Sequence, residues 1–210
     1  MRRALVQPPR TLQGFGRGRL NDIGPIILGR RLNSSESFGA YQALVYHKGG
    51  LVLRMLHFLL SDPAQDPIAS SDGTFNRMMT AFTERHRNGA ASTDNFRAVA
   101  SEHFRSTTAS LRMGTPNLNW FFRQWVYQTG LPSYRLEYAL EDQAGGRTLV
   151  TGTLFQDNVA ADWMMPLPVV FTFAGDRLGH ALVVARGPST PVELDPDAWV
   201  LSEKTETRRR

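Results

Sequence analysis

Cysteine is absent from this sequence of 210 residues. The chain therefore forms no disulfide and offers no thiolate metal ligand, and its redox compartment cannot be inferred. Long apolar runs are absent too: the longest, residues 51–60, contains Arg54 and His57 and is about half as long as a bilayer span requires. The apolar stretch near the N-terminus is too short for a signal peptide. We expect no membrane span and no signal peptide, and the localisation stays unknown.

Lysine is scarce, since 22 of the 24 basic residues are arginine. The net charge of +5 is concentrated at the two ends: residues 1–31 carry seven arginines against one acid, and residues 208–210 add three more. The rest of the chain is therefore net acidic. Because no folded segment carries the excess positive charge, we do not expect a nucleic acid as the partner. RNA binding by the arginine-rich ends is kept as a third hypothesis.

Residues 1–31 are rich in Pro, Gly and Arg and show no hydrophobic period, which predicts a basic, poorly ordered lead-in. Within it, residues 14–19 superficially resemble a glycine-rich phosphate loop or an RGG-type RNA-binding segment. No strand is expected before them and no clear helix after them, so a solvated basic segment is the simpler interpretation. The short apolar patch at residues 23–29 is expected to dock on the helical region that comes after it in the chain.

Apolar residues spaced three and four apart predict a helical region over residues 32–131. Its main helix is expected to start near Ser34 and to reach residue 60, buried almost all round except for a narrow polar stripe. Gly49 and Gly50 destabilise a helix by about 1 kcal/mol each, which suggests close approach of another element or a ligand. Three further helices are expected over residues 72–88, from residue 93 and from residue 117. The aromatic residues at 120–125 have helical spacing and are interpreted as core.

After Pro132 the hydrophobic period changes from 3.6 to 2, which indicates strands. Five short strands separated by Gly-containing turns predict a small antiparallel β-sandwich and an α+β chain with its boundary at residues 130–133. The expected domains are the lead-in (1–31), the helical portion (32–131), the sandwich (132–202) and a charged tail (203–210).

The five histidines do not have the spacing of a metal site. His47 and His57 lie too far apart on one helix to chelate together, and no His-Glu-x-x-His is present. Surface or internally hydrogen-bonded histidines are the expected interpretation. No residue of this chain is predicted to bind a metal or a cofactor.

Three segments in order resemble the gluzincin zinc aminopeptidases of the aminopeptidase N (membrane alanyl aminopeptidase) type. Residues 45–56 resemble the family's Y-x-K-G segment through Tyr46, Lys48 and Gly49. Residues 91–96 are similar to its s-t-x-d-F helix start, and residues 118–132 to its dl-x-w-F-F-x-q-W-v-x-x-x-G-x-P segment. The match covers about residues 24–201. It implies the helical C-terminal portion of a thermolysin-like catalytic domain, followed by a small antiparallel β-sandwich.

The resemblance assigns Tyr46 a catalytic role. In that family the tyrosine of Y-x-K-G hydrogen-bonds the tetrahedral oxyanion, while zinc polarises the peptide carbonyl. Lys48 matches the family's lysine and is expected to be structural. Without the resemblance, Tyr46 would be interpreted as a buried structural tyrosine at a helix start.

The family's zinc ligands, His-Glu-x-x-His and a distal glutamate, are missing from this chain. Only 45 residues precede Tyr46, with no histidine among them and Glu36 as the one glutamate. We therefore expect a fragment or split half of an aminopeptidase, inactive alone, with Zn in the parent family only. Its partner would be a separate zinc-binding half, and peptides would be substrates only of the complete enzyme. A non-catalytic protein-interaction module derived from such an enzyme is the alternative.

Overall fold

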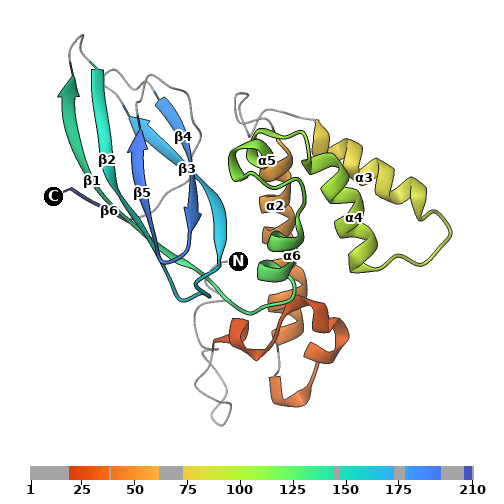
Figure 1. The fold of residues 1–210 in the computed structure, drawn as a ribbon. Helices are drawn as coiled ribbons and strands as arrows, with labels where there is room; N and C mark the ends of the chain where they lie inside the picture. The colour runs from red at the N-terminus through yellow and green to blue at the C-terminus, as the bar shows by residue number, and fades with distance from the viewer. Residues whose placement is uncertain are drawn as a thin grey trace. The chain divides into compact units, whose positions relative to one another are not determined.

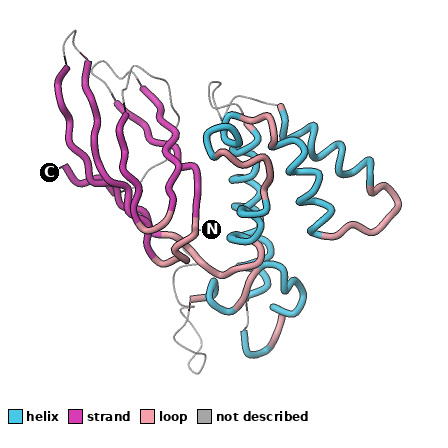
Figure 2. Tube along the Cα trace, in the orientation of Figure 1, coloured by secondary structure: helices cyan, strands magenta, loops and turns pink. Residues whose placement is uncertain are grey.

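The computed structural model describes residues 19–37, 39–61, 73–143, 147–172, 178–194 and 206–209. The chain divides into two compact units, and each is described by itself. The first contains residues 1–61 and 70–131 and is helical where it is described (Figure 1). The second contains residues 62–69 and 132–210 and is built of strands where it is described (Figure 2). This mixture confirms the α+β prediction.

The described residues of the helical unit form four short or irregular helices followed by five α-helices. They are η1 (Leu20–Ile23), η2 (Ile26–Leu32), η3 (Ser35–Ser37), η4 (Gln42–Lys48), α2 (Gly49–Leu60), α3 (Thr74–Arg85), α4 (Thr93–Phe104), α5 (Thr108–Met113) and α6 (Asn119–Trp125). The short helix α5, between Thr107 as N-cap and the left-handed Gly114, was not predicted. The loop expected over residues 62–72 lies outside the described residues.

The prediction that the main helix begins at Ser34 is wrong. Ser35–Ser37 form a separate 3-10 turn, and the backbone turns at Gly39, whose φ of 86° is open mainly to glycine. The helix starts at Ala40. The N–H of Ala43 donates to the Gly39 carbonyl at 2.9 Å. A break in the helix therefore precedes the region of Tyr46.

The second half of the supposed lead-in is folded. Residues 20–32 form η1 and η2, and the N–H of Ile27 donates to the Val126 carbonyl at 3.1 Å. Asn21 is buried, and its side-chain amide donates to the Thr129 carbonyl. The expectation of a poorly ordered segment is therefore wrong for residues 20–32. Buried polar contacts hold this segment in place, whereas the prediction considered only whether its apolar residues repeat with a regular period. Residues 1–18, with most of the glycine-rich stretch, lie outside the described residues.

The core of the helical unit is aromatic around α6. Trp120, Phe121, Phe122 and Trp125 are buried, while Arg123 is exposed, as the helical spacing predicted. A second cluster joins the lead-in to η4 through buried side chains of Leu32, Ala40, Ala43 and Leu44. Tyr41, Val45 and Leu51 pack against this second cluster. It is the part of the core that supports the Tyr46 helix.

The strand unit contains two sheets. Its strands are β1 (Ser133–Gln143), β2 (Arg147–Asp157), β3 (Met164–Thr172), β4 (Leu178–Arg186), β5 (Ser189–Leu194) and β6 (Glu206–Arg209). One sheet has the order β5-β2-β1-β6 and the other is the β3-β4 hairpin. The two share one hydrophobic core, formed by Leu136, Leu154, Val183, Ala185 and Val192. The five strands predicted within residues 132–202 correspond to β1–β5.

One expectation for this unit, the charged tail, is corrected by β6. It pairs in parallel with β1, from Arg135 opposite Glu206 to Tyr138 opposite Arg209, whereas the strand pairs within residues 132–202 are antiparallel, as predicted. The expected charged tail contributes this edge strand instead. The strand β6 forms through backbone hydrogen bonds, which do not require apolar side chains. The charged residues of the tail therefore gave no indication of a strand in the sequence.

Candidate functional site

Tyr46 lies in η4 and presents more than half of its surface to solvent, being 56% exposed. The interpretation that it is a buried structural tyrosine is therefore wrong. Its neighbours on either side of the chain, Val45 and His47, are partly buried. An exposed phenol held by a buried helix can reach a group supplied from outside the described chain.

The helix η4 is a π-helix. Its backbone bonds join residues five apart, as between the N–H of Gly49 and the carbonyl of Leu44. In an α-helix, a residue five positions on lies about 140° round the axis. The π geometry instead brings Tyr41 and Tyr46 onto nearly the same side, with their rings edge to face and their centroids 5.5 Å apart. The hydrophobic pattern gave no signal of this.

Tyr46 also affects the protonation of Tyr41. A side-chain hydrogen bond with Tyr46 raises the pKa of Tyr41, and the charge of a Tyr46 phenolate raises it further. Arg30 acts in the opposite direction.

The face of α2 next to Tyr46 is open. Gly50 is exposed and Leu53 is 43% exposed, four and seven residues after Tyr46. A Cβ added at Gly50 would meet no heavy atom within 4 Å, and one at Gly49 only the Leu44 carbonyl oxygen at 3.9 Å. Close packing within the described chain therefore does not explain the glycine pair.

Lys48 is the least expected residue of the site. Its side chain is 2% exposed, and Nζ has no hydrogen-bond partner among the described residues. Burial lowers the pKa of Lys48 to about 8, and the charge of Asp22 acts against this shift. The Y-x-K-G spacing identified Lys48 without revealing that it is buried and unpaired.

Two histidines, His57 and His86, pack against phenylalanine rings. His57 lies edge-on against Phe75, with ring centroids 4.8 Å apart, and His86 packs on Phe82 at 5.1 Å. Nδ1 of His47 is buried without a hydrogen-bond partner in the described part of the chain. Nowhere among the described residues do three His, Asp or Glu side chains gather closely enough to hold a metal ion.

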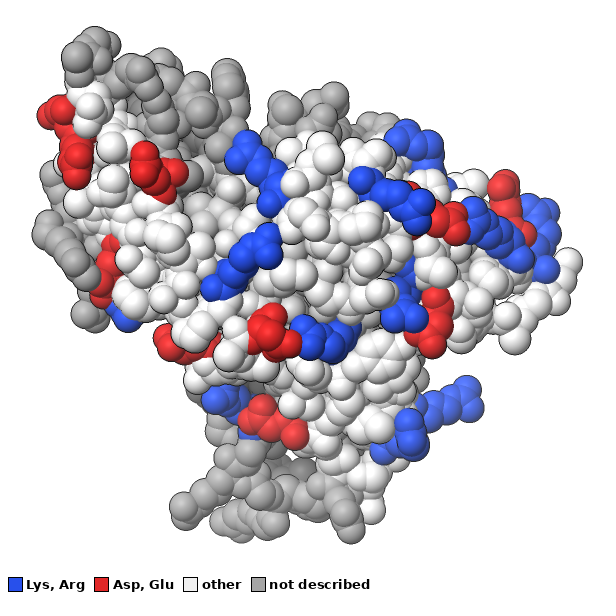
Figure 3. All heavy atoms as spheres, viewed as in Figure 1, with Lys and Arg blue, Asp and Glu red and all other residues white. Residues whose placement is uncertain are grey.

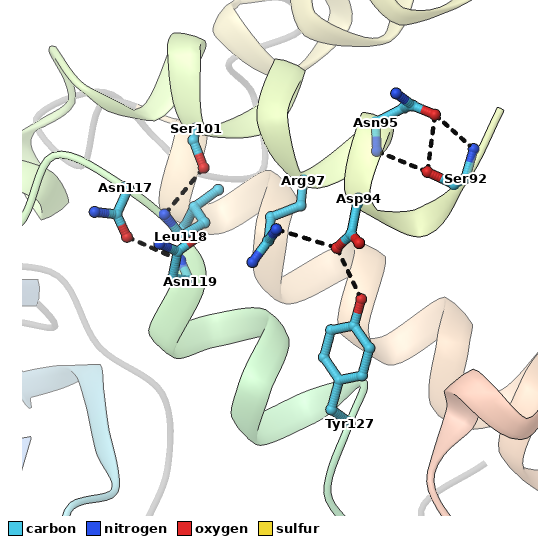
Figure 4. A network of polar contacts seen from close by, with 9 residues as sticks. All are labelled: Ser92, Asp94, Asn95, Arg97, Ser101, Asn117, Leu118, Asn119 and Tyr127. Atoms are coloured by element: carbon cyan, nitrogen blue, oxygen red, sulfur yellow. Dashed lines mark hydrogen bonds and ion pairs between the residues drawn. The ribbon is translucent and has the colours of Figure 1, made fainter.

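The second and third segments that carry the resemblance contact each other (Figure 4). At the start of α4, Asp94 accepts a hydrogen bond from the Tyr127 hydroxyl at 3.0 Å and pairs with Arg97 at 3.1 Å. Further along α4, Ser101 Oγ accepts the N–H of Leu118 at 3.1 Å. These contacts fix α6 against α4. They give Asp94 and Tyr127 a structural role.

The surface charge is mixed. On the face shown in Figure 3, basic side chains alternate with acidic ones and form no continuous basic field. One such alternation is the Arg85–Glu102 ion pair between α3 and α4, at 2.7 Å. In the described parts of the chain, no helix has the length and apolar character needed to cross a membrane.

No family model matches the chain. No curated protein matches it either.

Proposed function

We propose that this chain is part of an aminopeptidase N-like zinc metallopeptidase, which removes N-terminal amino acids from peptides, and that it contributes the oxyanion-binding tyrosine, Tyr46. The helical unit would be the C-terminal portion of a thermolysin-like catalytic domain, and the strand unit its β-sandwich. The observation that carries the proposal is the exposure of Tyr46 within the Y-x-K-G segment. A tyrosine kept only for packing would be covered.

The chemistry of a phenol suits this role. Attack on a peptide carbonyl creates a negatively charged oxygen. A neutral O–H group aimed at this oxygen forms a stronger hydrogen bond in the transition state than with the substrate. Loss of one such donor typically costs about 3–4 kcal/mol of transition-state stabilisation. The Tyr46 ring packs edge to face with Tyr41, and more than half of the residue is exposed. It can therefore serve as that donor.

The described residues do not fit a zinc site, because no three His, Asp or Glu side chains gather among them. The proposal requires a zinc-binding half to be supplied elsewhere, either by a further part of the same gene product or by a second polypeptide. The open face of α2 beside Tyr46 is where such a half would meet this chain.

A second candidate is a non-catalytic module that binds another protein. It is favoured by the exposed Leu53 and Tyr46 on the open face, since an apolar surface of this kind is typical of contact sites. The two candidates differ in whether binding of a partner creates a hydrolytic site.

The test starts from the DNA directly upstream of this coding sequence. We expect it to encode His-Glu-x-x-His and a distal glutamate. The polypeptide it encodes should hydrolyse alanine 4-nitroanilide when co-expressed with this chain, and neither part should do so alone. Upstream DNA without a zinc motif would favour the binding module. Stoichiometric zinc and anilide cleavage by the purified chain alone would show that its predicted inactivity is wrong.

A further inference from the structure

The segment Glu206–Arg209 forms the edge strand β6, which lies beside β1 in the four-stranded sheet (Figure 1). It pairs in parallel with residues 135–138 of β1. The strand β1 continues to Gln143, and its residues 139–143 are exposed. The edge of β1 is therefore longer than the segment of this chain that occupies it.

One face of β1 carries charged residues in a fixed order. Leu136 belongs to the shared core, so the odd-numbered residues on either side of it lie on the opposite face of the sheet. On that face Arg135 forms an ion pair with Glu137, and its guanidinium lies over the Phe155 ring of β2, 4.1 Å from the ring centroid. Glu141 follows farther along on the same face. The order along this face is therefore one basic residue followed by two acidic ones.

The register of β1 and β6 matches these charges. Arg135 lies opposite Glu206, and Glu137 lies opposite Arg208, so both positions combine opposite charges. Cross-strand pairs of opposite charge stabilise a sheet, whereas like charges destabilise it. A shift of the register by two residues in one direction would set Glu206 opposite Glu137. The same shift in the other direction would set Arg208 opposite Arg135. The charges of β1 therefore favour the observed register.

The connection from β5 to β6, residues 195–205, is long enough for this pairing within one chain. The strand order places β6 three strand spacings from β5, about 14 Å. Leu194 lies level with Leu140, five residues along β1 from Arg135, which adds about 17 Å along the strand. The two distances combine to roughly 22 Å, whereas twelve consecutive residue steps reach about 40 Å. The tail therefore reaches β1 of its own chain.

We propose that the edge of β1 is a docking site for an extended polypeptide strand that carries an acidic residue and, two residues later, a basic one, and that the tail segment 206–209 is its occupant within the same chain. This inference is independent of the proposed function of Tyr46. In strand addition, main-chain hydrogen bonds provide affinity and alternate side chains provide specificity. A partner strand with a second basic residue, four residues after the first, would gain a further pair opposite Glu141. Such a partner can displace the tail.

The test uses the full-length chain with Glu206→Arg and Arg208→Glu, which reverses the charges of the tail and leaves β1 unchanged. The probe is a fluorescein-labelled peptide of residues 202–210 extended by Thr-Arg, which supplies the base opposite Glu141, and binding is followed by fluorescence anisotropy. We expect the tail variant to bind the peptide at least about tenfold more tightly than the wild type, because the native tail competes at a high effective concentration. No binding to either chain would overturn the docking site. Equal affinity for both would overturn its occupation by the tail.

The reciprocal change in β1 tests the charge pattern. Arg135→Glu with Glu137→Arg keeps one residue of each charge at the two positions. This β1 variant should prefer, by about tenfold, a peptide in which Glu206 and Arg208 are exchanged, whereas the tail variant should prefer the native order. Circular dichroism verifies that each variant is folded. The same preference in both variants would overturn the charge-matched register.

The oligomeric state distinguishes the tail of the same chain from the tail of a second copy. We expect the wild type to elute as a monomer in size-exclusion chromatography, with and without the peptide. A wild-type dimer that the peptide dissociates would show that the tail docks on β1 of a second copy. That result would overturn the arrangement within one chain.

Discussion

Replacing Lys48 by methionine should stabilise the protein at neutral pH. Lys48 is 2% exposed, and its ammonium group has no hydrogen-bond partner among the described residues. A buried charge without a partner is among the most destabilising groups a core can contain. Methionine is unbranched, fills a similar volume and carries no charge, so it should occupy the same space.

The magnitude comes from the pKa. Burial lowers the pKa of Lys48 from 10.5 to about 8, and this difference corresponds to about 3 kcal/mol between the charged and neutral forms. At pH 7 the lysine is protonated in both the folded and the unfolded chain, so the folded wild type bears the full cost. Lys48→Met should therefore raise the free energy of unfolding by about 3 kcal/mol at pH 7.

The pH dependence provides an internal check. Between about pH 8 and pH 10.5, Lys48 releases its proton in the folded state but retains it in the unfolded state. The unfolded state then binds more protons, so the stability of the wild type rises with pH in this window. The advantage of Lys48→Met should shrink across the same window and nearly vanish above it.

The assay is urea unfolding followed by circular dichroism at 222 nm, which reports mainly on the helical unit. Arg54→Met, on the exposed side of α2, is the matched control and should change the free energy of unfolding by less than about 0.5 kcal/mol. A less stable Lys48→Met variant would refute the reasoning. So would an advantage that stays constant from pH 7 to pH 10.5.

Three further substitutions test individual elements by the free energy of unfolding. Gly50→Ala should stabilise α2 by about 1 kcal/mol, because the new methyl group enters open space, and destabilisation would show that this face is already covered. Ser92→Ala should lower the free energy of unfolding by about 1 kcal/mol, because the N-cap of α4 is lost. Ser106 is exposed and lies outside any helix, so Ser106→Ala should change it almost not at all. Equal effects of the two substitutions would contradict the role of Ser92 as N-cap. Gly152→Ala should cost more than about 2 kcal/mol, because its Cβ would overlap the Glu137 carbonyl oxygen on the neighbouring strand, and a neutral effect would contradict the β1–β2 register.

Regular helices and strands could be predicted because their apolar residues repeat with the period of the helix or strand. The alternation of Tyr134, Leu136 and Tyr138 identified β1, and these side chains do face the shared core. The helix expected from residue 93, with Thr93 and Asp94 as its cap, does begin there, but the N-cap is Ser92, whose side chain forms a capping box with Asn95. Both signals arise from local contacts.

The features around Tyr46 could not be predicted in the same way. A π-helix differs from an α-helix by one residue per turn, and the run from Gln42 to Lys48 has no composition that favours it. The burial of Lys48 is likewise set by tertiary contacts of η4. What the sequence did supply was the resemblance that identified Tyr46, and the structure adds its exposure and its partner Tyr41.

The central claim is that Tyr46 is the oxyanion donor of a site completed by a zinc-binding half. The most direct test is the kcat for alanine 4-nitroanilide of Tyr46→Phe in the reconstituted enzyme. We predict a loss of about 10²-fold to 10³-fold, as for removal of one oxyanion donor, with no loss for Tyr127→Phe. Unchanged kcat in Tyr46→Phe would contradict the claim.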